Sequence, residues 1–418
     1  MRLTRRVSVA VVGVAALLAA TACSSGNGGS SAPKDVEVFT WWADGGEKAG
    51  LDGLVSQFNT DCANFKFVNG AVAGGAGANA KQVLASRLAQ SDPPDTFQAH
   101  AGAELTDYIK AGQIEDLSQE YKDWGLTNAF PKGLIDNLTV GGKIYSVPAN
   151  IHRANVIWGN KAVLASAGIA SDAKTLDAFF ADLEKLKTKG VTPLALGRDW
   201  TQLMLFESVL ISDLGAAKFT GLWNGSSKWD GADVTKAITD YQKLLTYTNK
   251  DRDTFDWTDA EKLIMDGKAG YQLMGDWEAA DLDAKKFTGY SYSVFPGNGS
   301  TYQWLADSFV LPKGAKNPEG TKCWLKTVGS AAGQQAFNTK KGSIPARTDA
   351  VASAFPAYQQ AAIADWKTLA QVPSCAHGSA CSQGFQGALN SAMGKFSSDG
   401  NAAALQTALV AAGTQFAK

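Results

Sequence analysis

Aromatic, charged and amide side chains recur where the sequence predicts strand ends and loops. They are Trp41, Trp42, Gln98, His100, Trp257, Asp276, Trp277, Asp307, Lys341 and His377. The ring faces of a hexose carry C–H groups that pack on flat aromatic side chains. Its hydroxyl groups donate to carboxylates, accept from lysine and do both with an amide. The set therefore predicts a pocket for a hexose.

Each member of this set has a structural alternative when it is taken alone. A single tryptophan is more often part of a core than a plate for a ligand. Asp307 is also suited to capping a helix or a turn. Lys341 follows Lys340, which is typical of a solvated charged surface. The inference of a binding site therefore rests on the collective pattern.

Catalytic alternatives have weaker support. Asp276 and Asp307 are conceivable as the carboxyl pair of a glycosidase, but nothing in the sequence indicates that one of them is kept protonated. The chain has no G-x-S-x-G, H-E-x-x-H or C-x-x-C motif, and its three histidines are scattered. Gly74–Gly77 lacks the Lys-Ser/Thr of a phosphate loop and predicts a tight turn. We therefore expect a binding protein rather than an enzyme, with no cofactor and no metal.

The N-terminus has the anatomy of an export signal. Residues 1–22 carry three arginines in the first six positions and then an apolar run, Val7–Ala20, that is too short to span a bilayer. Thr21–Cys23 resembles the lipobox of bacterial lipoproteins, although Ala20 stands where leucine is usual. We expect acylation of Cys23. An ordinary secretory signal is the alternative, and the choice between Sec and twin-arginine export stays open.

Residues 23–35 are predicted to be a lipid anchor followed by a tether. Ser24–Lys34 reads SSGNGGSSAPK, and Gly/Ser-rich segments behave as flexible coils. No other stretch of the sequence is apolar enough to cross a membrane. We therefore expect an extracytoplasmic protein that its lipid holds at the outer face of the cell membrane.

Length and charge limit the classes of partner. The chain has 418 residues, which is enough for two or more domains. It carries 39 Lys and Arg against 40 Asp and Glu, whereas a nucleic-acid-binding protein normally needs a basic face. We therefore expect no nucleic-acid partner.

Four cysteines remain once Cys23 is assigned to the anchor. An even number in an exported protein suggests two disulfide bonds. Cys375 and Cys381 enclose a short loop and are suited to staple it, which leaves Cys62 and Cys323 for a long-range pair. Four free thiols are the alternative.

The candidate residues must be positioned by alternating strands and helices. Strands are predicted at 36–39, 65–68, 95–98, 191–196, 270–274 and 309–311, helices at 47–59, 81–90 and 175–187 and from 384 onward, and a hairpin over 138–147. In this α/β pattern the end of the predicted strand 95–98 delivers Gln98 and His100 into a loop. Ligands bind beyond the carboxyl ends of such strands and between domains. The sequence therefore predicts a site in a cleft between two lobes.

Several segments carry a family resemblance. They are Phe39–Ala43, Pro93–Gly102, Val147–Arg153, Met274–Trp277, Asp307–Phe309 and Lys341–Ile344. In this order they resemble the family 1 extracellular solute-binding proteins of bacterial ABC importers, in the branch that binds glucose or galactose. The similarity runs over almost the whole chain after the signal. Pro93–Gly102 is specific to this branch, whereas Gly275-Asp276-Trp277 is common across the family.

The resemblance implies roles for the candidate residues. It places His100 on one face of the hexose and Trp257 on the other, and it makes Gln98 a further contact. It also implies that Trp41 and Trp42 line the pocket and that Trp277 closes it. The polar groups that bond the hydroxyls would be Asp307, Lys341 and His377. Glu47 would be a further acidic contact, although the local spacing differs by one residue.

The resemblance also implies a two-lobed, maltose-binding-protein-like (type II periplasmic-binding-protein) fold with a hinge. The expected lobes are 36–149 with 309–350, and 150–308 with 351–418. Closure would bury the sugar and signal to a membrane permease. We expect a monomer that binds a glucose-like hexose, and the alternative in the same family is a disaccharide or oligosaccharide.

Overall fold

Strands and helices alternate through the described part of the chain, residues 34–417 of this computed structural model. The export signal 1–22, Cys23 and residues 24–33 of the tether lie outside these residues. Strand β1 already begins at Lys34, so Lys34 and Asp35 belong to a sheet and not to the tether expected over 23–35. The mixed α/β class expected from the sequence is confirmed.

The first sheet has the strand order β2-β1-β3-β13-β6. Its strands are β1 (Lys34–Phe39), β2 (Phe65–Asn69), β3 (Thr96–His100), β6 (Val147–Pro148) and β13 (Asp307–Val310). Its helices are α1 (Gly45–Asp61), α2 (Ala78–Ala89), α3 (Leu105–Lys110), α4 (Ser118–Asp123), α5 (Lys132–Leu138), α12 (Pro318–Gly329) and α13 (Ala331–Lys341). β1 runs parallel to β2 and β3, whereas β13 is antiparallel to β3 and β6. β3 is buried along its whole length, as expected of a strand covered on both faces.

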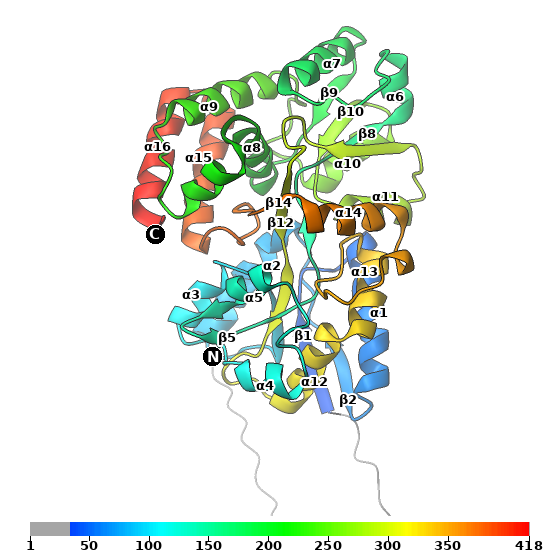
Figure 1. Ribbon diagram of the computed structural model, residues 1–418, viewed down its shortest axis with the longest axis vertical. Helices are drawn as coiled ribbons and strands as arrows, with labels where there is room; N and C mark the ends of the chain where they lie inside the picture. The colour runs from blue at the N-terminus through cyan, green and yellow to red at the C-terminus, as the bar shows by residue number, and fades with distance from the viewer. Residues whose placement is uncertain (1–33, 418) are drawn as a thin grey trace, which may run out of the picture. The chain divides into compact units, whose positions relative to one another are not determined.

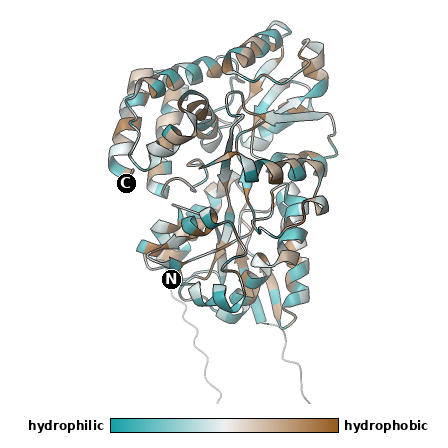
Figure 2. Ribbon diagram, viewed as in Figure 1, coloured by the Kyte–Doolittle hydropathy of each residue, from teal (hydrophilic) through white to brown (hydrophobic). Residues whose placement is uncertain are grey.

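The second sheet has the order β11-β8-β10-β9. Its strands are β8 (Val156–Asn160), β9 (Thr192–Ala195), β10 (Ala269–Leu273) and β11 (Tyr290–Val294). The helices of this region are α6 (Lys161–Ser166), α7 (Leu176–Thr188), α8 (Trp200–Trp223), α9 (Ala232–Leu245), α10 (Trp257–Met265), α11 (Trp277–Ala284), α15 (Gln383–Asp399) and α16 (Ala402–Phe416). Helix α8 is buried on all sides over its first half, and Figure 2 shows its predominantly hydrophobic colour.

A third sheet, with the order β14-β12-β7, lies between the two larger sheets in Figure 1. Its strands are β7 (His152–Arg153), β12 (Thr301–Leu305) and β14 (Ala370–Pro373), with helix α14 (Ala357–Thr368) nearby in sequence. Only Ala306 separates β12 from β13 of the first sheet. The chain therefore passes between the sheets through short, hydrogen-bonded segments. A separate hairpin, β4 (Thr139–Val140) with β5 (Lys143–Ile144), turns at Gly141-Gly142, where both residues have positive φ.

Buried apolar side chains form two large clusters. The first draws on residues 36–151 and 302–366, and the second on residues 154–305 and 372–412. Trp366 of α14 belongs to the first cluster, although the sequence-based boundaries put it in the second lobe. Those boundaries stay a prediction, because residues 33–418 form one compact unit. No helix within residues 34–417 combines the length and apolarity of a membrane span.

Strand β3 differs from its sequence-based prediction in one way that matters for the site. It extends to His100, two residues beyond the expected end, so Gln98 and His100 lie inside the strand and not in a following loop. β13 pairs with it in register, and Asp307 lies directly across from His100. Both residues are therefore fixed by backbone hydrogen bonds of the sheet.

Two disulfide bonds differ greatly in the length of chain that they close. Cys62–Cys323 spans 261 residues and joins the end of α1 to α12, whereas Cys375–Cys381 spans 6 residues. A cross-link restricts the unfolded chain more strongly when its loop is longer. We expect Cys62→Ser with Cys323→Ser to lower the free energy of unfolding by about 5 kcal/mol. Cys375→Ser with Cys381→Ser should lower it by about 2 kcal/mol. Urea unfolding measures both, and a reversed order would contradict the loop-length explanation.

Candidate functional site

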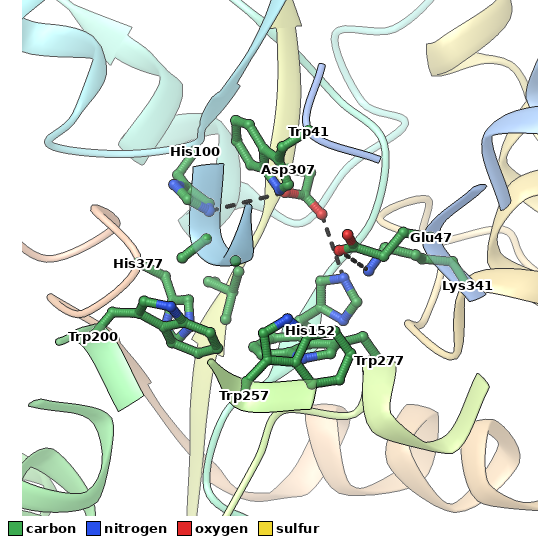
Figure 3. Close-up of a pocket in the computed structure, with 13 residues that line it drawn as sticks. Trp41, Glu47, His100, His152, Trp200, Trp257, Trp277, Asp307, Lys341 and His377 are labelled. Atoms are coloured by element: carbon green, nitrogen blue, oxygen red, sulfur yellow. Dashed lines mark hydrogen bonds and ion pairs between the residues drawn. The ribbon is translucent and has the colours of Figure 1, made fainter. Parts of the chain in front are cut away.

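A pocket receives side chains from both core clusters (Figure 3). Its lining residues are Trp41, Glu47, Gly75, Ala76, His100, His152, Trp200, Trp257, Trp277, Leu305, Asp307, Lys341 and His377. Apart from Glu47, Gly75 and Ala76, these residues are all buried. The pocket is therefore largely screened from bulk water.

Three tryptophans of the pocket occupy the first position of a helix. Trp200 begins α8, Trp257 begins α10 and Trp277 begins α11. In Figure 3 they lie on the opposite side of the pocket from Trp41 and Asp307. A side chain in the first turn points toward the start of its helix, and three helix starts at one place therefore bring three indole rings together.

An imidazole ring held between two carboxyl groups forms the polar centre of the pocket. The Nδ1–H of His152 donates to Asp276, and its Nε2 lies 3.3 Å from Oδ2 of Asp307. Burial alone would lower the pKa of His152, but the charge of Asp276 and the contacts with both carboxyl groups raise it. The arrangement therefore favours the protonated ring.

Asp307 is held in place before any ligand arrives. Gln98 and Asn150 each donate a side-chain hydrogen bond of 2.8 Å to its carboxylate. Burial alone would raise the pKa of Asp307, but the hydrogen bond from His152 and the charges of His152, Lys341 and His100 hold it well below its ordinary value. Asp307 is therefore an ionised hydrogen-bond acceptor.

His100 is oriented by a buried ion pair. Its Nδ1 lies 2.8 Å from Oε2 of Glu104, and Lys81 donates to the same oxygen at 2.8 Å. The ring of Trp41 packs against His100 at a centroid distance of 5.0 Å. Because Nδ1 is occupied by Glu104, the Nε2 side of the His100 ring faces Asp307 at 4.0 Å.

Lys341 and Glu47 close another side of the pocket. Lys341 is the last residue of α13, and its Nζ donates to Glu47 in the first turn of α1 at 3.2 Å. The same Nζ lies 5.7 Å from the ring centroid of Trp277. Glu47 keeps 23% of its side chain exposed. This pair therefore lies between the interior of the pocket and the solvent.

The disulfide loop, residues 374–381, brings His377 into the pocket. The ring of His377 packs against Trp200 and Trp277, each at a centroid distance of 5.4 Å. The loop also touches the opposite core cluster, because the backbone of Gly378 accepts a 2.9 Å hydrogen bond from Glu104 N–H. A Cβ on Gly378 would lie 2.4 Å from the Glu104 carboxylate, and its φ is +68°. Glycine is therefore required at this contact.

Most of the residues that the sequence singled out line one pocket. They are Trp41, Glu47, His100, Trp257, Trp277, Asp307, Lys341 and His377. Three others lie behind its wall. Trp42 packs on Phe337 at 4.5 Å within the core, Gln98 bonds Asp307, and Asp276 bonds His152. These three support lining residues and do not line the pocket themselves.

Sequence reasoning did not select five lining residues, namely Gly75, Ala76, His152, Trp200 and Leu305. One partial signal was available for Trp200. The dipeptide Asp-Trp stands at the start of three pocket helices, at 199–200, 256–257 and 276–277, but it also occurs at 123–124 and 365–366, whose tryptophans do not line the pocket. No comparable signal marks His152, whose role depends on carboxyl groups 124 and 155 residues away in the chain. Within residues 34–417, no cluster of His, Cys, Asp or Glu is arranged to hold a metal ion.

Glu104 makes a pH-dependent contribution to stability. Burial alone would raise its pKa, but the charges of Lys81 and His100 and their hydrogen bonds lower it from 4.5 to about 2. The stabilisation is therefore complete above pH 4.5 and is lost as the pH falls toward 2. We expect the difference in free energy of unfolding between wild type and Glu104→Gln to shrink by about 2 kcal/mol between pH 5 and pH 3.

Urea unfolding at a series of pH values measures this difference. Glu319→Gln is the matched control, since Glu319 lies at an exposed position of α12. Its effect should stay nearly constant over the same range. A constant difference for Glu104→Gln as well would show that the ion pair does not depress the pKa.

Comparisons with known proteins extend over nearly the whole chain. The family model of the bacterial extracellular solute-binding proteins matches residues 42–335. An uncharacterized ABC transporter extracellular-binding protein of Pyrococcus horikoshii is 35% identical over 93% of this chain and 91% of its own length. A probable sugar-binding periplasmic protein of Mesorhizobium japonicum is 34% identical over 80% of this chain and 81% of its own length.

Solved structures show the same architecture. The bacterial solute receptor AcbH, described as having an exclusive preference for β-D-galactopyranose, superposes with a TM-score of 0.81 at 20% identity, over 91% of this chain and 98% of the receptor. A chitin oligosaccharide binding protein gives 0.78 at 22% identity, over 93% and 99%. The fold is therefore the two-lobed α/β fold of these proteins. The family model matches most of the chain, and the Pyrococcus horikoshii relative is 35% identical over 93% of it. The chain therefore belongs to the family of bacterial extracellular solute-binding proteins.

Proposed function

We propose that this protein is the monosaccharide-binding component of an ABC importer, with a glucose-like hexose as its ligand. The observation that carries the proposal is one enclosed pocket in which four indole rings meet charged and imidazole groups. Flat rings suit the C–H faces of a pyranose, and the polar groups suit its hydroxyls. The relative from Mesorhizobium japonicum, described as probably sugar-binding, supports the same ligand class.

The walls of the pocket favour one sugar ring. Trp41 of the first core cluster and the Gly75-Ala76 turn line the pocket with Trp200 and Trp257 of the second cluster, against which Ala76 packs. A disaccharide would need a groove that continues beyond these walls. Solved structures of the same fold include an oligosaccharide-binding protein, so the fold alone does not decide the ligand.

Charge in the pocket speaks against a glycosidase that uses Asp276 and Asp307. Hydrolysis requires one carboxyl group that is protonated and able to donate to the leaving oxygen. The pKa of Asp307 is held well below its ordinary value, which makes Asp307 a poor acid. Asp276 accepts from His152 and does not line the pocket. The geometry suits recognition of hydroxyl groups better than cleavage.

Binding and delivery would use closure of the two lobes about the short segments by which the chain passes between the sheets. The pocket takes residues from both core clusters, so a ligand there stabilises the arrangement in which the clusters are close. A ligand shifts such an equilibrium only by the contacts that it makes in the closed state. The membrane permease would then distinguish the loaded, closed protein from the open one.

Calorimetry with a sugar panel tests the ligand. We expect one hexose among glucose, galactose and mannose to bind tightly, and a hundredfold excess over its dissociation constant to stabilise the protein by about 2.7 kcal/mol. Trp257→Ala should weaken binding roughly 10- to 100-fold, because it removes a buried aromatic face. Trp124→Ala is the matched control, since Trp124 does not line the pocket.

The same panel should include xylose, maltose and cellobiose. If maltose or cellobiose binds more tightly than every monosaccharide, the ligand is an oligosaccharide and the monosaccharide assignment is wrong. If none of the sugars binds, the sugar-binding proposal itself fails. Release of nitrophenol from chromogenic glycosides, lost in Asp276→Asn, would establish an enzyme instead.

The proposal includes a lipid anchor at Cys23, on the evidence of the sequence around it. We expect Cys23→Ala to move the protein from the membrane fraction to the medium or periplasm, because the proposed lipid attachment would be lost. Immunoblotting of the fractions measures the distribution. Ser56→Ala, at an exposed position of α1, leaves the lipobox and both disulfide bonds intact, and this control should stay with the membrane. Unchanged membrane association of Cys23→Ala would contradict the anchor.

A further inference from the structure

Glu207 is a buried acid that does not line the pocket but holds the loop that does. It lies on α8 with no solvent exposure. Its Oε1 accepts from the backbone N–H groups of Cys375 and Ala376, at 2.6 and 3.2 Å. Its Oε2 accepts from the Ser374 hydroxyl and from the Gln303 amide, both at 2.7 Å. One carboxylate thus makes four hydrogen bonds, three of them to the disulfide loop.

These contacts decide where the hydrogen of Ser374 points. An ionised carboxylate only accepts hydrogen bonds, and a serine hydroxyl has a single hydrogen to donate. With that hydrogen on Glu207, the Ser374 oxygen can only accept from its other neighbour. This neighbour is Nδ1 of His377, at 2.9 Å. Nδ1 must therefore carry a hydrogen.

The tautomer of His377 follows from its charge state. Burial, and then the positive charges of His100, His152 and Lys81, lower the pKa of His377 well below 6.5. A neutral imidazole has one N–H, so a hydrogen on Nδ1 leaves Nε2 bare. Nε2 is buried and has no hydrogen-bond partner among residues 34–417. His377 itself lines the pocket.

We propose that Glu207, acting through Ser374, is a positioning residue that fixes His377 as the Nδ1–H tautomer, so that Nε2 accepts a hydrogen bond from a hydroxyl group of the ligand. The hydrogen bond from the ligand hydroxyl rests on the sugar-binding function proposed above, whereas the assignment of the tautomer does not. Nε2 then favours a ligand group that donates a hydrogen bond. A fluorine at the same place of the ligand would be rejected, because it can only accept.

Protonation of Glu207 should reverse the direction of this relay. Burial raises the pKa of Glu207 to about 7, and its four hydrogen bonds oppose that rise. Only uncharged groups contact the carboxylate, namely Ser374, Gln303 and the two backbone amides. Below this pH, one proton from solvent lets Glu207 donate to Ser374 and Ser374 donate to Nδ1. The hydrogen of His377 then resides on Nε2.

Histidine-labelled protein without sugar tests the tautomer directly. Long-range ¹H–¹⁵N spectra show which ring nitrogen carries a hydrogen, and His377→Gln assigns the signal. At pH 8 we expect Nδ1–H in the wild type and Nε2–H in Glu207→Gln, whose amide donates to Ser374. Asp213→Asn is the matched control, because Asp213 lies on the same helix and bonds Lys236 instead of the loop. It should keep the wild-type tautomer.

Ser374→Ala keeps the proposal testable if Glu207→Gln does not fold. It leaves the bonds from Glu207 to Cys375 and Ala376 intact and removes only the relay. We expect a mixture of both tautomers that no longer changes between pH 8 and pH 6. Nε2–H in the wild type at pH 8, or unchanged Nδ1–H in both variants, would overturn the proposal.

A second readout uses singly fluorinated deoxyglucoses in calorimetry. In the wild type at pH 8, fluorine at the position that meets His377 should weaken binding at least about tenfold relative to glucose. In Glu207→Gln this penalty should fall below about threefold, because Nε2–H can donate toward fluorine. An equal penalty in both proteins would contradict the role in binding. If glucose does not bind at all, the sugar-binding proposal fails while the tautomer measurement still stands.

Discussion

The buried array Asp276–His152–Asp307 is the constraint on which the rest of the site depends. Charged groups lose their hydration on burial, and only close opposite charges with further hydrogen bonds offset that loss. His152 comes from β7 of the third sheet, Asp276 from the segment between β10 and α11, and Asp307 from the start of β13 in the first sheet. The array therefore requires both sheets and the crossing segments to be assembled before it can exist.

The supports around this array explain why so many polar side chains are buried without lining the pocket. Gln98 and Asn150 orient Asp307, Glu104 orients His100, and Glu207 orients the loop of His377. Each support leaves its partner with a fixed geometry and a defined donor or acceptor. A pocket built in this way loses little conformational freedom when a ligand binds, because the side chains that contact the ligand are already ordered.

The sequence predicted the strands and helices around the site more reliably than it predicted which side chains face the pocket. Trp41 and Trp42 are adjacent and chemically equal, yet one lines the pocket and the other packs on Phe337. Local pattern does not distinguish them, because the difference depends on where α13 packs. Asp276 was selected for its type and its place after a strand, but a histidine far away in the chain accounts for its position. Such pairings arise from tertiary contacts that no short-range spacing encodes.

Most lining residues belong to strands or to the ends of helices, where paired backbone fixes them. The exceptions are Trp41, the Gly75-Ala76 turn and His377. A substitution of the Trp41, Ala76 or His377 side chain leaves the backbone hydrogen bonds of the sheets and helices in place. Ligand preference can therefore diverge there while the architecture persists, which fits solved relatives that share this fold at about one-fifth identity yet are described for galactopyranose and for chitin oligosaccharide.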